Sequence, residues 1–227
     1  MRTLMVVTAG LSNPSSTRQV ADRISDAVTT AVTARGEALE VKVVELREII
    51  NDLAQVMSTG MSTQRLDEIK RDLSAADGLI AVTPVFKASY SGLFKMFFDV
   101  LDQDALNGMP TIIAATAGSA RHSLVLEFAV RPLLVYLRSR VAPTSLFAAT
   151  EDFGSSEGAA FERRIHRAAG ELADMMVDSA SAVGGLGGVT AEGQGTERRR
   201  KTGVLEADDE ITPFAEMLKG LDGTPGK

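Results

Sequence analysis

The sequence predicts an α/β fold in which helices cover both faces of a doubly wound sheet of five parallel strands. Short apolar runs typical of buried strands alternate along the chain with helical patterns. Polar, glycine-containing loops follow the first and third of these runs, where ligands bind in open α/β sheets. Right-handed crossovers between the strands then favour the order 2-1-3-4-5.

The expected elements follow from apolar spacing and from the positions of glycine and proline. Strands are expected over residues 3–8, 39–45, 78–83 and 110–115, with a fifth within 141–148. Helices are expected over about 18–34, 46–52, 63–75, 91–101 and about 124–137, and within 157–183. Charges interrupt the apolar side chains of 39–45, which predicts an edge strand. Residues 53–61 are expected to form a flexible loop.

The most informative stretch is residues 83–92, TPVFKASYSG, between the third strand and a helix. Pro84 cannot donate to a strand ladder and is expected to end the strand. Ser91 can cap the helix, so that its first N–H groups point at the crevice. Phe86 and Tyr90 could stack on a ring or belong to the core. A planar ligand that gains negative charge would suit this place.

A second loop, residues 9–17, follows the first strand and leads into a helix. Gly10 allows the backbone to approach a ligand closely. Hydroxyls and N–H groups at a helix start form a phosphate site without arginines or a metal, and this loop offers those of Ser12, Ser15, Ser16 and Thr17. The dinucleotide and P-loop fingerprints are absent, which favours a monophosphate. An ordinary serine-rich helix cap is the alternative.

These two loops resemble those of the NADPH-dependent FMN reductase family, of flavodoxin-like fold, in the branch that supplies reduced flavin to a separate monooxygenase. Residues 83–92 are similar to that branch's Thr-Pro-Val-Tyr-Lys-Ala-Ser-Phe-Ser-Gly almost residue for residue. Residues 115–119 (ATAGS), His122 and residues 128–132 (FAVRP) match as well, and the resemblance covers roughly residues 2–150. Leu11 stands where a small residue or serine is common, and Phe128 where sulfonate-linked members often carry tyrosine.

The resemblance implies an NAD(P)H:FMN oxidoreductase in which FMN carries the hydride chemistry, with no catalytic side chain and no metal. The implied FMN-binding residues are those of the two loops and of a third loop after the fourth strand: Gly10, Ser12, Ser15, Ser16, Thr17, Thr83, Pro84, Val85, Phe86, Lys87, Ala88, Thr116, Ala117, Gly118 and Ser119. Lys87 and the start of the following helix would favour the reduced, anionic flavin. His122 is expected to be a polar residue near a helix start rather than a proton donor.

Two other functions remain open. The chain could retain FMN and reduce quinones, azo dyes or metal oxyanions. It could instead be a flavodoxin-like electron carrier or a regulatory binding module without enzymatic activity. Asp99 and Asp102 are spaced i, i+3 on one predicted helix, but surface charge is a better interpretation than a metal pair, because no histidine or cysteine lies nearby.

Bulk properties agree with a cytoplasmic enzyme. The 227 residues fit one domain with an extension, and 44% hydrophobic residues can fill a core. A net charge of −6 argues against nucleic acid and anionic membranes as partners. The absence of cysteine suits a reducing compartment. No apolar run reaches the roughly 18 residues of a membrane helix, and no signal peptide is evident.

The sequence predicts a reductase domain over residues 1–182 and a glycine-rich, charged extension over 183–227. Half of the chain's 20 glycines lie beyond residue 180, around the basic run at 198–201. Apolar residues recur with helical spacing at 211–221, which predicts a helix that docks on the domain or on a neighbouring subunit. The phenylalanines of helix 91–101 and the apolar residues of helix 124–137 exceed what one sheet face should cover. We therefore expect a homodimer or homotetramer.

Overall fold

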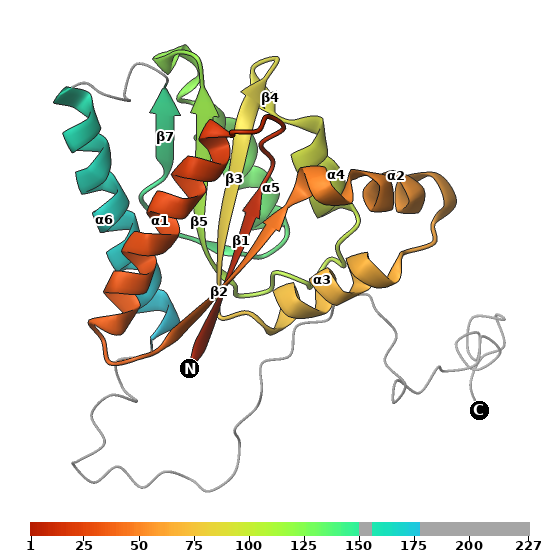
Figure 1. The fold of residues 1–227 in the computed structure, drawn as a ribbon, viewed down its shortest axis with the longest axis horizontal. Helices are drawn as coiled ribbons and strands as arrows, with labels where there is room; N and C mark the ends of the chain where they lie inside the picture. The colour runs from red at the N-terminus through yellow and green to blue at the C-terminus, as the bar shows by residue number, and fades with distance from the viewer. Residues whose placement is uncertain (150–155, 178–227) are drawn as a thin grey trace, which may run out of the picture.

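The computed structural model describes residues 1–149 and 156–177, which form a three-layer α/β domain (Figure 1). The sheet has the path β2 (Leu39–Glu45), β1 (Arg2–Thr8), β3 (Gly78–Phe86), β5 (Pro110–Ala117) and β6 (Arg140–Val141). All of these neighbours are parallel. The strand order 2-1-3-4-5 is confirmed, with β2 at the edge, and the fold is flavodoxin-like.

The fifth strand of the predicted sheet is divided into two pieces. β6 pairs with the start of β5, and β7 (Leu146–Ala149) pairs with its end, from Ala114↔Leu146 to Ala117↔Ala149. Pro143 lies in the gap between them and has no N–H to offer a ladder. The split keeps β5 central in the sheet along its whole length.

The helices divide the core into two apolar clusters, one on each face of the sheet. α1 (Ser16–Thr33) and α6 (Ser156–Met176) cover one face, where Ile24, Val28 and Leu172 are fully buried. The other face carries η1 (Leu46–Ile49), α2 (Ile50–Thr59), α3 (Gln64–Ala75), α4 (Gly92–Asp99), the π-helical turn η3 (Leu126–Val130) and α5 (Arg131–Tyr136). Figure 1 shows α1 and α6 together on their side, away from α2, α3 and α4.

Residues 53–61 are not the flexible loop that the sequence predicted. α2 continues to Thr59, and Gly60 closes it in the left-handed conformation, with its N–H donating to Val56 O. Leu53 is fully buried in the core of that face, and Val56 packs against it. Burial of these two side chains outweighs the low helix propensity of the Ser58–Thr59–Gly60 end.

Pro84 does not end its strand, as had been expected. Pro84 stays in register with Thr116 of β5, and β3 continues to Phe86. The last two residues turn to an antiparallel partner, β4 (Ser89–Tyr90), through Val85↔Tyr90 and Phe86↔Ser89. Proline has no N–H to donate. At the margin of a parallel ladder this costs no hydrogen bond if no acceptor faces its nitrogen.

The expectation that helix 91–101 leaves apolar surface uncovered is wrong. Phe94, Phe97 and Phe98 are at most 2% exposed and pack against one another. The other helix named in that prediction, 124–137, does expose apolar side chains, at Leu124, Phe128, Val135 and Tyr136. None of the helices in the described residues combines the length and the apolar composition that crossing a bilayer requires.

Candidate functional site: three loops at the carboxyl edge

Three loops meet at the carboxyl edge of the sheet, because the strands that precede them are neighbours. They follow β1, β3 and β5, and their alignment is fixed by the pairs Thr8↔Val82 and Pro84↔Thr116. A hydrogen bond of 2.9 Å between the hydroxyls of Thr17 and Thr116 joins the first loop to the third. The residues that the sequence singled out are therefore brought to one edge of the sheet.

The first loop is a tight bend built around Gly10. The N–H of Ala9 donates to Val82 O at 2.9 Å, and Gly10 is buried. A Cβ at Gly10 would lie 2.0 Å from Ser15 Oγ. Ser15 Oγ is the N-cap acceptor of α1 and receives the N–H of Arg18 at 3.2 Å. Glycine is required here because the helix cap packs directly on the loop backbone.

This loop fits a phosphate held by neutral donors. The stretch from Leu11 to Pro14 and the hydroxyl-bearing Ser16 are exposed at the N-terminus of an 18-residue helix. Directly before the loop, Thr8 is 1% exposed, and its hydroxyl has no hydrogen-bond partner among the described residues. A buried hydroxyl without a partner is costly unless a ligand or a water completes it.

Arginines do lie beside this loop, contrary to the expectation of a site without them. Arg18 donates to Asp22 at 2.7 Å and to Glu45 at 2.6 Å. Arg47 donates to the other oxygen of Glu45 at 2.8 Å and to Ser12 O at 3.2 Å. The hydrogen bond to Asp22 is the main cause that raises the pKa of the Arg18 guanidinium. Each arginine is thus matched by carboxylates.

The second loop is a β-hairpin that the sequence did not reveal. Its turn residues, Lys87 and Ala88, both have positive φ, at 50° and 66°. Such a pair is typical of a type I′ turn, in which glycine and asparagine are usual. Phe86, Lys87 and Ala88 are exposed at the tip. The hairpin therefore offers backbone groups and an aromatic ring at the carboxyl edge.

We expect Ala88→Gly to stabilise the domain by about 1 kcal/mol, because glycine adopts the left-handed conformation without a Cβ clash. Urea denaturation of the two proteins measures the difference. Gly118→Ala is the control: it exchanges glycine for alanine at the same edge of the sheet, in the third loop. The new Cβ would meet no atom within 4 Å, so stability should change little. A lower unfolding free energy for Ala88→Gly would contradict the left-handed geometry of the turn.

Thr83 fixes the base of this hairpin from inside. Its side chain is fully buried, and its hydroxyl donates to Pro84 O and accepts the N–H of Ser91, both at 3.0 Å. Ser91 Oγ in turn caps α4 by accepting the N–H of Phe94 at 3.2 Å. The hydroxyl of Thr83 is thus engaged within the protein, and the exposed residues of the hairpin are Phe86, Lys87 and Ala88.

Thr83→Val should cost about 1–3 kcal/mol of unfolding free energy, because the buried N–H of Ser91 would lose its acceptor. Thr83→Ser keeps the hydroxyl and should retain most of the stability. Thermal and chemical denaturation of both variants distinguish them. Equal stability of Thr83→Val and wild type would show that the hydrogen bond does not hold the hairpin.

The third loop is short and open. Thr116 is buried, Ala117 and Ser119 are half-buried, and Gly118 is exposed with no atom within 4 Å of where its Cβ would stand. The 3-10 turn η2 (Ala120–His122) follows, and His122 is exposed at its end. This loop closes the edge beside β7.

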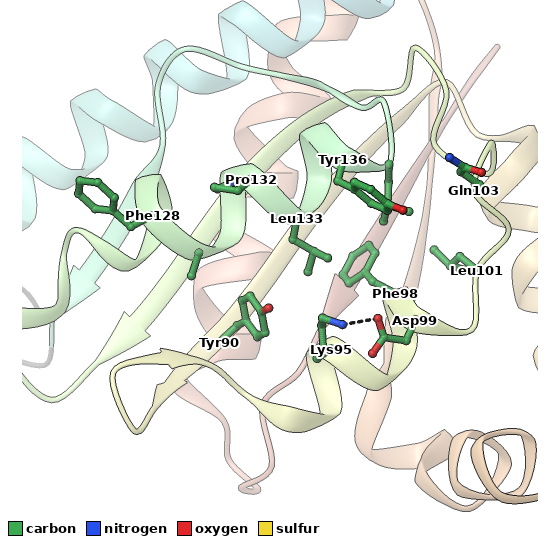
Figure 2. A pocket seen from close by; sticks show the side chains of 12 residues that line it. Tyr90, Lys95, Phe98, Asp99, Leu101, Gln103, Phe128, Pro132, Leu133 and Tyr136 are labelled. Atoms are coloured by element: carbon green, nitrogen blue, oxygen red, sulfur yellow. Dashed lines mark hydrogen bonds and ion pairs between the residues drawn. The ribbon is translucent and has the colours of Figure 1, made fainter.

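A groove of about 670 Å³ lies next to the hairpin, between α4 and the η3–α5 segment (Figure 2). Tyr90 lines it and packs on Phe94, with ring centroids 5.9 Å apart. Asp99 is ion-paired with Lys95 on its wall. A second cavity, of about 420 Å³, lies along β2 and α3. Neither of these two cavities is lined by residues of the first or third loop.

The fold is flavodoxin-like, with three loops at the carboxyl edge of its sheet, and comparisons with known proteins identify the family. The family of NADPH-dependent FMN reductases matches residues 1–154. A relative from Pseudomonas putida, the NADH-dependent FMN reductase SfnF, is 33% identical over 70% of this chain and 86% of its own length. The FMN reductase (NADPH) of Pseudomonas aeruginosa is 31% identical over 66% and 78%. The chain belongs to the NADPH-dependent FMN reductase family.

Solved structures place the fold in the same group. An oxidoreductase from Corynebacterium diphtheriae has 68% identity and a TM-score of 0.76, over 78% of this chain and 97% of that one. The NADH:FMN oxidoreductase EMOB, in its apo form, has 28% identity and a TM-score of 0.64, over 74% and 89%. The chain is an oxidoreductase that uses FMN and NAD(P)H, and these relatives include both NADH- and NADPH-dependent enzymes.

Proposed function

We propose that this NAD(P)H-dependent FMN reductase releases reduced FMN to a flavin-dependent monooxygenase. The observation that carries the proposal is the exposed first loop, whose neighbouring arginines are already paired. Glu45 and Asp22 engage these two arginines, so a phosphate bound there would meet mainly the hydroxyls and N–H groups of the exposed loop. Such a site supports moderate affinity and exchange of the flavin.

We further propose which residues hold FMN. The phosphate rests on the first loop, and the ring lies along the outward side of the hairpin and beside the third loop. The proposed contacts are Gly10, Ser12, Ser15, Ser16, Thr17, Thr83, Pro84, Val85, Phe86, Lys87, Ala88, Thr116, Ala117, Gly118 and Ser119, with Thr83, Ser15 and Thr116 also shaping the loops from within. FMN, when bound, accepts hydride from the nicotinamide. The protein binds, orients and partly shields the ring.

Release is tested by separating the reductase from its acceptor. Purified protein, FMN and NAD(P)H are placed on one side of a dialysis membrane, and a monooxygenase that lacks its own reductase on the other, without oxygen until mixing. Product formation across the membrane supports release. Protein that stays yellow through purification and reduces quinones rapidly, with no product across the membrane, would favour the flavin-retaining alternative.

We also propose a homo-oligomer, dimeric or tetrameric, assembled through the exposed apolar face before and within α5. Four side chains of this face are 54–78% exposed: Leu124, Phe128, Val135 and Tyr136. Exposed apolar side chains gathered on one segment favour association. Light scattering at micromolar concentration should give a dimer or tetramer, and Phe128→Glu should shift it towards monomer. A clean monomer for wild type would refute the assembly.

The extension and the location complete the proposal. We propose a reductase domain over residues 1–182 and an extension over 183–227; the boundary and the helix predicted at 211–221 lie outside the described residues. Truncation after Ala182 should leave NAD(P)H oxidation with FMN intact and alter FMN affinity or assembly. Loss of folding would show that the extension belongs to the core.

We place the reaction in the cytoplasm, where NAD(P)H is available and a cysteine-free chain needs no oxidising compartment.

A further inference from the structure

The edge strand ends on a carboxylate that links two arginines to the first loop. Glu45, the last residue of β2, has only 16% of its side chain exposed. Its Oε1 accepts from Arg18 on α1 and its Oε2 from Arg47 on η1. We call Arg18, Glu45 and Arg47 the arginine clamp. The clamp joins three elements at the edge of the site.

The clamp holds the exposed part of the first loop at its middle. The loop is anchored at its start by the bond from Ala9 to Val82 and at its end by the cap on Ser15. Between these anchors, Ser12 O accepts from Arg47 Nη1 at 3.2 Å. Because Ser12 is exposed, this bond restrains a stretch that core packing does not restrain.

The other arm of the clamp reaches the helix start. The backbone N–H of Arg18 is the group that Ser15 Oγ caps, and its guanidinium is held by Glu45 and Asp22. The side chains of Arg18 and Arg47 are 33% and 27% exposed, so solvent screens these bonds less than it screens a fully exposed pair. Glu45 therefore couples the N-terminus of α1 to the position of Ser12.

We infer that Arg47, held by Glu45, is a positioning residue that sets the shape of the loop for the flavin phosphate. This inference rests on the proposed phosphate site. Arg47 acts through the carbonyl of Ser12, so its loss should affect ligands that carry the phosphate and spare those that lack it. Preorganisation of the loop removes an ordering cost that FMN would otherwise meet on binding.

Arg47→Met tests the inference by titration of FMN and riboflavin, followed by flavin fluorescence. We expect the Kd of FMN to rise about tenfold and that of riboflavin to change less than twofold. In steady state, KM for FMN should rise while kcat at saturating FMN stays within twofold. Glu45→Gln should produce a smaller change in the same direction, because its amide can accept from only one arginine.

Lys42→Met is the matched control. Lys42 lies on β2, the strand that ends at Glu45, and pairs with Asp72 at 3.1 Å, so the variant loses the same charge away from the loop. It should leave both flavin affinities unchanged. Arg47→Lys separates charge from geometry: full rescue would mean that charge alone matters and would overturn the positioning role. Equal loss for FMN and riboflavin in Arg47→Met would also overturn it, as would no loss for either flavin.

Wild-type protein distinguishes this inference from the proposed phosphate site. If wild type binds FMN no better than riboflavin, the phosphate site itself is wrong. If wild type prefers FMN and Arg47→Met keeps the full preference, the phosphate site stands and the clamp has no positioning role.

Discussion

Gly10→Ala is expected to weaken FMN binding by at least about tenfold and to lower NAD(P)H oxidation at limiting FMN. The new Cβ would lie 2.0 Å from Ser15 Oγ, so Ser15 must turn away from the Arg18 N–H that it caps. Loss of such a cap costs about 0.5–2 kcal/mol, and the donors at the helix start move with it. Fluorescence titration with FMN measures the affinity, and thermal denaturation measures the stability.

Gly92→Ala is the matched control for this change. Gly92 opens α4, and a Cβ there meets nothing within 4 Å. Alanine is a better helix former, so stability should be unchanged or slightly increased and FMN affinity retained. If Gly10→Ala bound FMN as tightly as wild type, the loop around Gly10 could not be the phosphate site in this geometry.

Phe94→Ala should lower the free energy of unfolding by about 3–5 kcal/mol, the range for removing a buried phenylalanine side chain. Phe94 is fully buried and lies between Tyr90 and Phe98, with centroid distances of 5.9 and 4.7 Å. Because Tyr90 belongs to β4, the cavity should also loosen the hairpin. Urea denaturation measures the first effect, and KM for FMN the second.

Met57→Ala provides the comparison, since Met57 is 53% exposed on α2 and should change the free energy of unfolding by less than about 0.5 kcal/mol. A Phe94→Ala variant as stable as Met57→Ala would contradict the packing of the α4 face. If Phe94→Ala lost the expected ~3–5 kcal/mol but kept its KM for FMN, packing of Phe94 would not influence flavin binding.

The sequence was informative where its pattern is local. Apolar runs identified the strands, and the cap predicted at Ser91 is confirmed as the start of α4. The prediction of a loop at 53–61 was wrong because Ser58, Thr59 and Gly60 are typical of loops. Leu53 is buried in the same core cluster as residues of α4, which are far away in the sequence. Propensity gives way to tertiary packing at such positions.

The meeting of the three loops was predicted from the sequence, but the hairpin turn and the arginine clamp beside the first loop were not. The three loops could be placed together because adjacent parallel strands end at one edge. The turn at Lys87 and Ala88 was not recognisable, since neither residue is the glycine or asparagine usual there. The arginine clamp joins residues 18, 45 and 47. Arg18 lies in the first turn of α1 and Glu45 ends the strand beside β1, and that adjacency was the signal available in the sequence.

A crystal structure with FMN tests the central claim most directly. We expect the phosphate at the N-terminus of α1, within hydrogen-bonding distance of the first loop, and the ring along the outward side of Val85 to Ala88 next to Gly118. Phosphate density elsewhere, such as in the groove between α4 and α5, would contradict the assignment of all three loops.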